Sequence, residues 1–158
     1  MITEGLVFAL LGAALATALA GAGSAIGVAI AGKAGNGVIS EKPELFGRVL
    51  ILQALPGTQG IYGFLMSVLI LAKIGILGGN AIPLDEELGR AFLYAALPIA
   101  IGGLVSAIYQ GKAAASAIHM VAKQPTLTAR GMTMTAIVET YAILSLLVSI
   151  LMWVSIPV

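Results

Sequence analysis

Four long apolar stretches separated by short polar segments dominate the pattern of this chain. The apolar stretches cover roughly residues 5–31, 50–76, 91–117 and 131–156. Each exceeds the length of about 20 residues that a helix needs to cross ~30 Å of hydrocarbon. The segments between them, at 40–44, 78–90 and 123–126, are polar, and each carries a proline, as helix ends often do. The pattern predicts an all-α membrane protein with four transmembrane helices.

Composition supports a location within a bilayer. Hydrophobic residues make up 59% of the chain, charged residues only 9%, and the mean hydropathy is +1.07. A soluble domain of this size could not bury so much apolar surface. The Ala-rich start resembles a signal peptide, but Glu4 stands where a cationic region belongs, so we expect a retained first helix. We therefore expect a multi-pass protein of the cell membrane.

Charge and cysteine content exclude several function classes. The net charge of +1 gives no indication of nucleic-acid binding, so no nucleic acid is expected as a partner. The chain has no cysteine, which excludes disulfides, thiolate metal sites and thiol nucleophiles. A phosphate-binding GxxxxGK[ST] loop is also absent from the sequence. We therefore do not expect the chain to hydrolyse ATP by itself.

An internal repeat relates the two halves of the chain. A shift of 82 residues, without a gap, superimposes Pro43, Leu45, Arg48, Ala54, Thr58, Ile61 and Leu65 on Pro125, Leu127, Arg130, Ala136, Thr140, Ile143 and Leu147. This indicates a duplicated helical hairpin, with a first repeat at residues 1–79 and a second at 80–158. Because each repeat holds two spans, both have the same orientation in the membrane, unlike inverted repeats. Parallel copies suit a ring.

The charged residues near the connections predict the orientation of the spans. Basic residues flank the first and third connections: Lys33, Lys42, Arg48, Lys112, Lys123 and Arg130. The middle connection instead carries the acidic cluster Asp85, Glu86 and Glu87 beside Arg90. By the positive-inside tendency, loops 40–44 and 123–126 face the cytoplasm, and both termini lie outside.

The first and third predicted helices share small residues at every fourth position. The first has Gly23, Gly27, Ala31 and Gly35, and the third has Gly103, Ala107, Gly111 and Ala115. Such stripes let helix backbones approach closely. They fit either packing within one hairpin or packing in the crowded inner layer of a ring, and their recurrence in both repeats favours the ring.

One acidic side chain lies deep within a predicted span. Glu139 follows Arg130 by nine residues, which places it about 13 Å below the cytoplasmic end at ~1.5 Å per residue. Thr58 and Gln59 follow Arg48 at matching depth. A bare carboxylate there costs at least ~2.5–3.5 kcal/mol. Glu139 must therefore be protonated, paired or bound to an ion, and a purely structural role is the less favoured alternative.

A polar face of the second predicted helix lies at the depth of Glu139. Its members, at i, i+3, i+4 and i+7, are Leu55, Thr58, Gln59 and Tyr62. Pro56 has no N–H, and with Gly57 beside it the helix is expected to kink and tilt carbonyl groups outward. This face thereby offers hydroxyl, amide and backbone oxygens. Tyr62 either donates its hydroxyl to the carboxylate or packs as an ordinary aromatic.

These oxygens and the carboxylate favour a cation site. Gln110 in the third predicted helix adds an amide oxygen if that helix packs alongside. Hard cations such as Na⁺ prefer oxygen ligands of this kind, whereas a proton needs little beyond a carboxylate. Helix-to-helix hydrogen bonding is the alternative for each polar residue alone. Their convergence on Glu139 points to a transported cation.

Three motifs together resemble the proteolipid of the rotor ring (subunit K or c, the duplicated 16 kDa type) of V-type ATPases, most closely the bacterial sodium-translocating kind. They are LPGTQGIYG at 55–63, YQGKAAA at 109–115 and VETYAIL at 138–144. The resemblance implies a rotor ring of about ten copies, with the first and third helices inside. It also implies Na⁺ bound by the backbone oxygen of Leu55, by Thr58, Gln59, Gln110 and Glu139, with Tyr62 hydrogen-bonded to the glutamate.

The resemblance implies partners as well. A stator membrane subunit of the a or I type carries an essential arginine, central-stalk subunits contact the cytoplasmic loops, and lipid surrounds the ring. ATP hydrolysis then takes place on partner subunits.

Since Glu139 aligns with Gly57 in the 82-residue superposition, one chain carries one ion.

Three alternatives remain open from the sequence. A proton rotor of the same architecture differs only in its ion. A small four-helix drug/proton antiporter also uses one intramembrane glutamate, but it should line its cavity with aromatics, which make up only 6% of this chain. A passive pore or scaffold would not depend on Glu139.

Overall fold

Helices make up nearly all of the computed structural model, which describes residues 3–158. The α-helices are α1 (Glu4–Glu41), α2 (Phe46–Ala54), α3 (Thr58–Lys73), α4 (Glu86–Lys123) and α5 (Thr128–Ser155). Short 3₁₀ segments separate them: η1 (Pro43–Leu45), η2 (Leu55–Gly57), η3 (Ile76–Gly78) and η4 (Pro125–Leu127). Within the described residues, four helical segments are long and apolar enough to cross a membrane: Glu4–Glu41, Pro43–Lys73, Glu86–Lys123 and Pro125–Ser155. The predicted all-α fold with four spans is confirmed.

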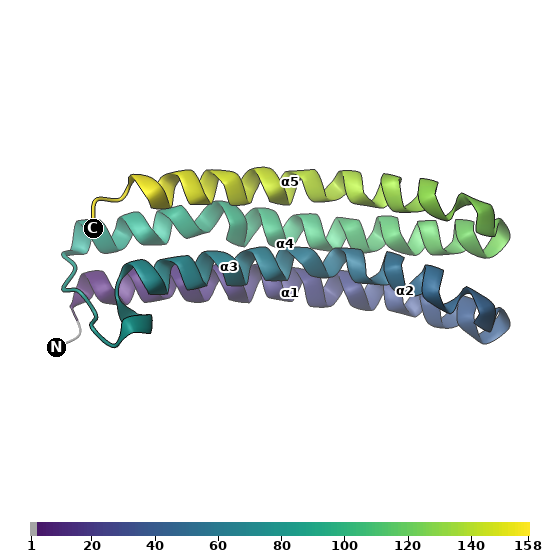
Figure 1. Ribbon diagram of the computed structural model, residues 1–158, viewed down its shortest axis with the longest axis horizontal. Helices are drawn as coiled ribbons and strands as arrows, with labels where there is room; N and C mark the ends of the chain where they lie inside the picture. The colour runs from purple at the N-terminus through teal and green to yellow at the C-terminus, as the bar shows by residue number, and fades with distance from the viewer. Residues whose placement is uncertain (1–2) are drawn as a thin grey trace.

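The four rods lie side by side along the long axis of the molecule (Figure 1). α2, η2 and α3 follow one another as a single rod beside α1. Both termini and the long connection between α3 and α4 lie at one end, and the two tight turns at η1 and η4 lie at the other. The two predicted cytoplasmic loops therefore share one end, as two repeats of the same orientation require.

The helix boundaries repeat with the same 82-residue shift as the sequence. This shift carries α1 onto α4, each of 38 residues, and η1 onto η4. It also carries the rod from Phe46 to Lys73 onto α5. The duplicated hairpin is therefore visible in the backbone. The repeats differ in this region at one place, since η2 interrupts the rod formed by α2 and α3, whereas α5 continues without a break.

Equivalent residues begin and end the long helices of both repeats. The side chain of Thr3 accepts a hydrogen bond from the N–H of Leu6, at 3.2 Å, and Asp85 accepts one from Leu88, at 2.8 Å. Such N-caps satisfy backbone donors that have no partner within the helix. Pro43 and Pro125 stand at the first position of η1 and η4, where a missing N–H is tolerated. Both hairpins thus use the same local signals.

The glycine stripes bring α1 and α4 into close contact across the two hairpins. A Cβ added to Gly23 would lie 2.6 Å from the Cα of Leu104, and one added to Gly27 would collide with the carbonyl of Ala107. A Cβ on Gly111 would collide with Gly27 itself. Most of the small-residue stripe therefore packs between repeats rather than within one hairpin. Gly35 is the exception, because it packs against Val49 of α2 in its own hairpin.

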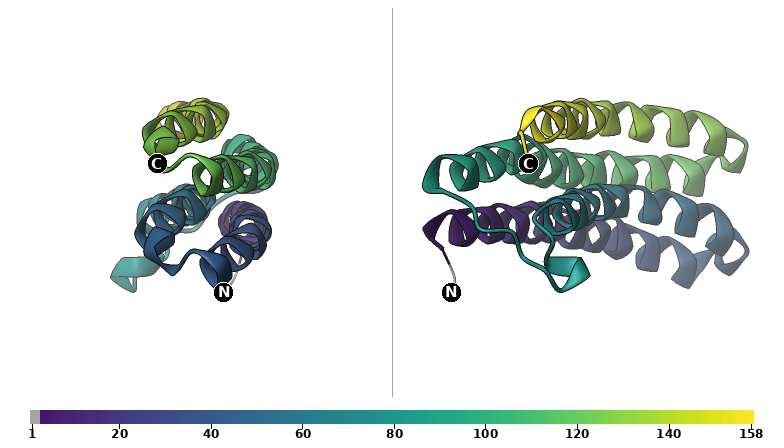
Figure 2. Two further views of the ribbon diagram at one scale, coloured as in Figure 1. Left: turned by 90° about the vertical axis from the view of Figure 1, so that its right-hand side faces the viewer. Right: turned by 60° about the vertical axis from the view of Figure 1, so that its left-hand side comes forward.

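The bundle has two layers when viewed along its axis (Figure 2). α1 and α4 lie on one side, and the rod α2–α3 and helix α5 lie on the other. Many large apolar side chains on the second layer remain exposed, among them Ile61, Phe64, Ile137 and Leu144. Apolar surface of this extent requires lipid or neighbouring chains around it. The chain is a membrane protein; below, the rod α2–α3 and helix α5 are called the outer rods, and α1 and α4 the inner helices.

Candidate cation-binding site

A break in the first outer rod exposes oxygens at the start of α3. The 3₁₀ segment Leu55–Gly57 stands where Pro56 and Gly57 predict a helix break. The hydroxyl of Thr58 donates to the carbonyl oxygen of Leu55 at 3.1 Å and lies 3.3 Å from Oε1 of Gln59. A proline cannot supply the N–H that a regular helix needs at this point. The break therefore gathers a hydroxyl and two carbonyl-type oxygens within one turn.

Two fully buried glutamines connect α3 to the inner helix α4. Nε2 of Gln59 donates to Oε1 of Gln110 at 2.6 Å and lies 3.3 Å from Oγ of Ser106. Nε2 of Gln110 donates to the backbone carbonyl of Thr135 in α5 at 3.2 Å. Buried amides need such partners, because an unpaired polar group in an apolar setting is costly. Gln110 thus packs beside α3. From the sequence, this contact was expected only if the third helix packed alongside the second.

The carboxylate of Glu139 meets the same cluster from α5. The hydroxyl of Tyr62 donates to Oε1 of Glu139 at 2.6 Å, across 77 positions of the chain. Oγ of Ser106 donates to the carbonyl of Val138, the residue before Glu139, at 3.0 Å. The structure therefore joins α3, α4 and α5 beside Glu139, whose carboxylate accepts a hydrogen bond from Tyr62, while Thr58, Gln59 and Gln110 bond to one another and to the backbone.

The donor set matches a monovalent cation in charge and in ligand type. Amide and backbone carbonyl oxygens each have two lone pairs. The amide oxygens of Gln59 and Gln110 each accept one side-chain hydrogen bond and keep acceptor capacity, whereas the carbonyl oxygen of Leu55 accepts two, from the hydroxyl and the backbone N–H of Thr58. Within residues 3–158, no group of three or more His, Cys, Asp or Glu side chains forms a metal cluster. One carboxylate with neutral oxygens leaves no net charge when a singly charged hard cation binds.

Sequence reasoning missed three polar residues of this network. Ser106 bridges Gln59 and Val138, Thr135 supplies the carbonyl for Gln110, and Ser24 accepts a hydrogen bond from the N–H of Gly60 at 2.8 Å. A signal was present, because Ser106 precedes Gln110 by one helical turn and Thr135 precedes Glu139 in the same way. Ser24 and Ser106 are also equivalent under the 82-residue shift.

The equivalent position in the other half of the repeat has lost this chemistry. Under the 82-residue shift Gln59, Tyr62, Gln110 and Glu139 correspond to Tyr141, Leu144, Val28 and Gly57. Among the proposed ligand side chains and Tyr62, Thr58 alone keeps its residue type, at Thr140. One chain therefore contains one set of oxygens around a carboxylate, and the second set has been replaced mainly by apolar groups.

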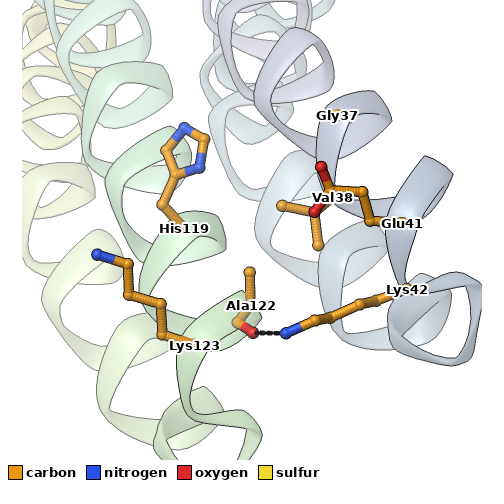
Figure 3. A pocket seen from close by; sticks show the side chains of 7 residues that line it. All are labelled: Gly37, Val38, Glu41, Lys42, His119, Ala122 and Lys123. Atoms are coloured by element: carbon orange, nitrogen blue, oxygen red, sulfur yellow. Dashed lines mark hydrogen bonds between the residues drawn. The ribbon is translucent and has the colours of Figure 1, made fainter.

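A separate groove lies at the end of the bundle that carries the two tight turns. It measures about 540 Å³ and is lined by Gly37, Val38, Glu41, Lys42, His119, Ala122 and Lys123. Figure 3 shows Lys42, at the end of α1, donating to the carbonyl of Ala122 in α4 at 2.6 Å, with His119 and Lys123 on the same part of α4. This groove is remote from Glu139 in the chain and mainly basic, so it belongs to a different surface.

Family comparison gives the class to which this architecture belongs. The chain belongs to the ATP synthase C subunit family, whose model matches residues 11–70 and again residues 93–152. The two matches are related by the same 82-residue shift as the helices. Duplication of the family's helical hairpin is thus seen in the sequence, in the backbone and in the family model.

Individual relatives are similar over nearly the whole chain. The V-type sodium ATPase subunit K of Enterococcus hirae is 46% identical over 94% of this chain and 91% of its own length. The A-type ATP synthase subunit K of Methanocaldococcus jannaschii is 37% identical over 97% of this chain and 64% of its own length. The A-type subunit K of Sulfolobus acidocaldarius is 52% identical, but only over 39% of this chain and 60% of its own length.

Proposed function

We propose that this chain is the rotor-ring subunit of a rotary V-type ATPase and carries one Na⁺ across the membrane at Glu139. The observation that carries the proposal is the hydrogen-bond network that joins α3, α4 and α5 beside one intramembrane carboxylate. Similarity to a subunit K whose name specifies sodium supports the choice of ion. Proton transport would not require the additional oxygens from two glutamines and a threonine.

The proposed ligands of the ion are the oxygens that the network holds near Glu139. They are the backbone oxygen of Leu55, the hydroxyl of Thr58, the amide oxygens of Gln59 and Gln110, and the carboxylate of Glu139. Tyr62 holds the carboxylate in place through its hydroxyl. Pro56 and Gly57 contribute indirectly, because the break at η2 positions the oxygen of Leu55.

Charge neutrality links ion binding to rotation. A loaded site combines one carboxylate with one Na⁺ and has no net charge, so it passes lipid at low cost. An empty carboxylate at this depth is unfavourable by at least ~2.5–3.5 kcal/mol. Only loaded sites therefore move past lipid, whereas an empty site needs a cationic partner. An arginine on a stator subunit meets this need while ions leave and enter.

The remaining surfaces of the chain suit the partners of a rotor. We propose that repeats 1–79 and 80–158 of successive copies alternate around a ring of about ten chains, with α1 and α4 inside. Loops 40–44 and 123–126 then face the cytoplasm, and both termini lie outside. The basic groove with Lys42, His119 and Lys123 lies at these loops, where central-stalk subunits dock. ATP hydrolysis takes place on other subunits.

Carbodiimide labelling tests the proposed site. The reagent attacks protonated buried carboxylates, so bound Na⁺ should slow the labelling of Glu139 in the membrane-embedded complex. Protection by Na⁺ across a range of pH, with weaker protection after Thr58→Ala, is the expected result. Labelling that ignores Na⁺ at every pH would instead establish a proton rotor. A complex that transports normally after Glu139→Gln would exclude both rotors.

A further inference from the structure

Lys73, the last residue of α3, contacts the end of α5 in the other repeat. Its ammonium group donates hydrogen bonds to the carbonyl oxygens of Trp153 and Ile156, both at 2.8 Å. It also lies over the ring of Trp153, 4.8 Å from the centroid, in a cation–π contact. The last carbonyls of a helix have no partner within the helix, and a cation is favourable beside them. Lys73 therefore ties the C-terminal end of α5 to α3, and we call this set of contacts the lysine clasp.

The second repeat has a serine where the first has this lysine. The 82-residue shift carries Lys73 onto Ser155. The hydroxyl of Ser155 donates to the carbonyl of Leu151 in its own helix at 2.8 Å. Both α3 and α5 end at the same end of the bundle (Figure 1). The side chain at this position thus crosses to the other outer rod in the first repeat and stays on its own helix in the second.

Side-chain hydrogen bonds join α3 to α5 and its C-cap at two levels within residues 3–158. One level is the candidate cation site, where Tyr62 donates to Glu139 at 2.6 Å. The other level is the lysine clasp. Tyr62 and Lys73 are 11 positions apart on α3, about 16 Å along the helix. The clasp and the candidate site therefore lie in the same gap between the same two helices.

Between these two levels, each outer rod is tied to the inner helix of its own hairpin. Oγ of Ser67 in α3 lies 2.6 Å from the hydroxyl oxygen of Thr17 in α1. Oγ of Ser149, at the equivalent position of α5, accepts a hydrogen bond from the N–H of Ile99 in α4 at 3.1 Å. These bonds hold each rod within its hairpin. They do not act across the gap between the two rods, which the clasp and Tyr62 bridge.

We infer that Lys73 is a positioning residue of the cation site proposed above, on which this role rests. The clasp holds the outer end of α5 against α3 and so keeps the hydroxyl of Tyr62 within hydrogen-bond distance of Glu139. A bond between groups that are already held in place costs less conformational entropy to form. Lys73 thus strengthens Na⁺ binding without touching the ion, because it limits how far the two rods that share the site can separate.

Carbodiimide labelling of Glu139 in the membrane-embedded complex measures this effect. Lys73→Met keeps a long side chain but has no hydrogen-bond donor. We expect half-protection of Glu139 to need about three- to fivefold more Na⁺, less than after loss of the Tyr62 hydroxyl itself. Lys73→Arg keeps the charge and several donors, so it should restore the wild-type value. The matched control is Ser155→Ala, at the equivalent position of the second repeat, and it should leave half-protection unchanged.

A double variant separates positioning from a general structural role. Two changes about 16 Å apart usually act independently, so their fold-changes multiply to within about twofold. If Lys73 acts through Tyr62, Lys73→Met should not raise the Na⁺ requirement further in a complex that already carries Tyr62→Phe. Fold-changes that multiply in the double variant would overturn the inference.

The single variants also separate the role of Lys73 from the proposed function. Na⁺ protection that is unchanged in assembled Lys73→Met complex overturns the role of Lys73 and leaves the sodium rotor standing. If Na⁺ does not protect Glu139 in the wild-type complex, the cation site and the role of Lys73 fail together. If Lys73→Met does not assemble, Lys73→Gln, which is polar but shorter and uncharged, replaces it. A raised Na⁺ requirement in that variant supports the role, and an unchanged requirement overturns it.

Discussion

The two outer rods of this chain descend from one segment but contribute differently to the site. Residues 46–73 and 128–155 have the same length and position in the two hairpins. The first rod is interrupted at η2 and supplies uncharged groups, namely Thr58, Gln59 and Tyr62. The second is continuous and supplies Glu139 at the position where the first has Gly57. One rod thus carries the charge, and the other carries neutral oxygens and the helix break.

This difference teaches why a single residue does not define the site. A carboxylate alone offers charge, but most of the neutral partners proposed to hold the ion, Leu55, Thr58 and Gln59, come from the first repeat, and Gln110 comes from the inner helix of the second. The most direct experiments therefore substitute one residue in one repeat and compare the effect on Na⁺ transport or binding with that of a control substitution elsewhere in the chain.

Removal of the only intramembrane carboxylate should have the largest effect. Glu139→Gln keeps the size of the side chain but cannot neutralise a cation. We expect ATP-driven Na⁺ uptake by reconstituted complex to fall to background, while the complex still assembles. The control is Glu87→Gln, a change of an exposed acidic residue in the first turn of α4. Retained uptake in Glu139→Gln would contradict the coupling role.

A carboxylate introduced into the first rod should not create a second site. A Cβ at Gly57 meets only Val28, at 3.7 Å, so Gly57→Glu fits the backbone. The equivalents of the two glutamines are Tyr141 and Val28, which offer no amide oxygens. We expect a new carbodiimide-reactive carboxylate without Na⁺ protection and a cost of at least ~2.5–3.5 kcal/mol on membrane insertion. A doubled Na⁺ stoichiometry would show that charge alone suffices.

Loss of one neutral ligand should weaken Na⁺ binding without abolishing it. Gln110→Ala deletes an amide oxygen and leaves Nε2 of Gln59 without its 2.6 Å acceptor. By comparison with changes around other metal sites, we expect about 10- to 100-fold more Na⁺ for half-protection of Glu139. The matched control is Val28→Ala, the equivalent position of the first repeat. Equal effects in both variants would indicate general loosening of the inner layer.

Removal of the tyrosine hydroxyl should have a smaller effect. Tyr62→Phe keeps the ring but deletes the 2.6 Å hydrogen bond to Glu139. Hydrogen bonds to charged groups contribute ~1.5 kcal/mol or more, so we expect about tenfold weaker Na⁺ protection. Tyr141→Phe tests the exposed tyrosine two residues after Glu139 and should leave protection unchanged. If Tyr62→Phe needs the same Na⁺ concentration for half-protection of Glu139, the hydrogen bond from Tyr62 does not stabilise the ion-bound site.

The smallest effect is expected from the bridging serine that only the structure revealed. Ser106→Ala removes the link from Gln59 to the carbonyl of Val138. A neutral hydrogen bond contributes about 1 kcal/mol net, so Na⁺ protection should weaken by about fivefold. Ser24→Ala, the equivalent change in the first repeat, is expected to have less effect on Na⁺ because Ser24 contacts the backbone of Gly60. A larger loss of Na⁺ protection in Ser24→Ala than in Ser106→Ala would contradict a role for Ser106 as the bridge between Gln59 and Val138.

Much of the fold could be predicted because its signals are local. Spans of apolar residues, prolines at the turns and the 82-residue repeat predicted four helices in two hairpins, as observed. Gly23 and Gly27 were predicted to lie in close helix contacts, but the sequence left the partner helix open. A glycine stripe has the same periodicity whichever neighbour it meets, so only the packed structure assigns it to α4.

The sequence by itself determined which chemistry was present and at what depth: one carboxylate, a Pro-Gly break, and oxygen-bearing side chains on one helix face. These follow from helix periodicity and from the cost of charge in hydrocarbon. The tertiary structure decided which groups meet, since Tyr62 and Glu139 are 77 positions apart and Gln59 and Gln110 are 51 apart. Side-chain periodicity defines the faces of each helix, whereas the contacts between faces depend on how all four rods pack together.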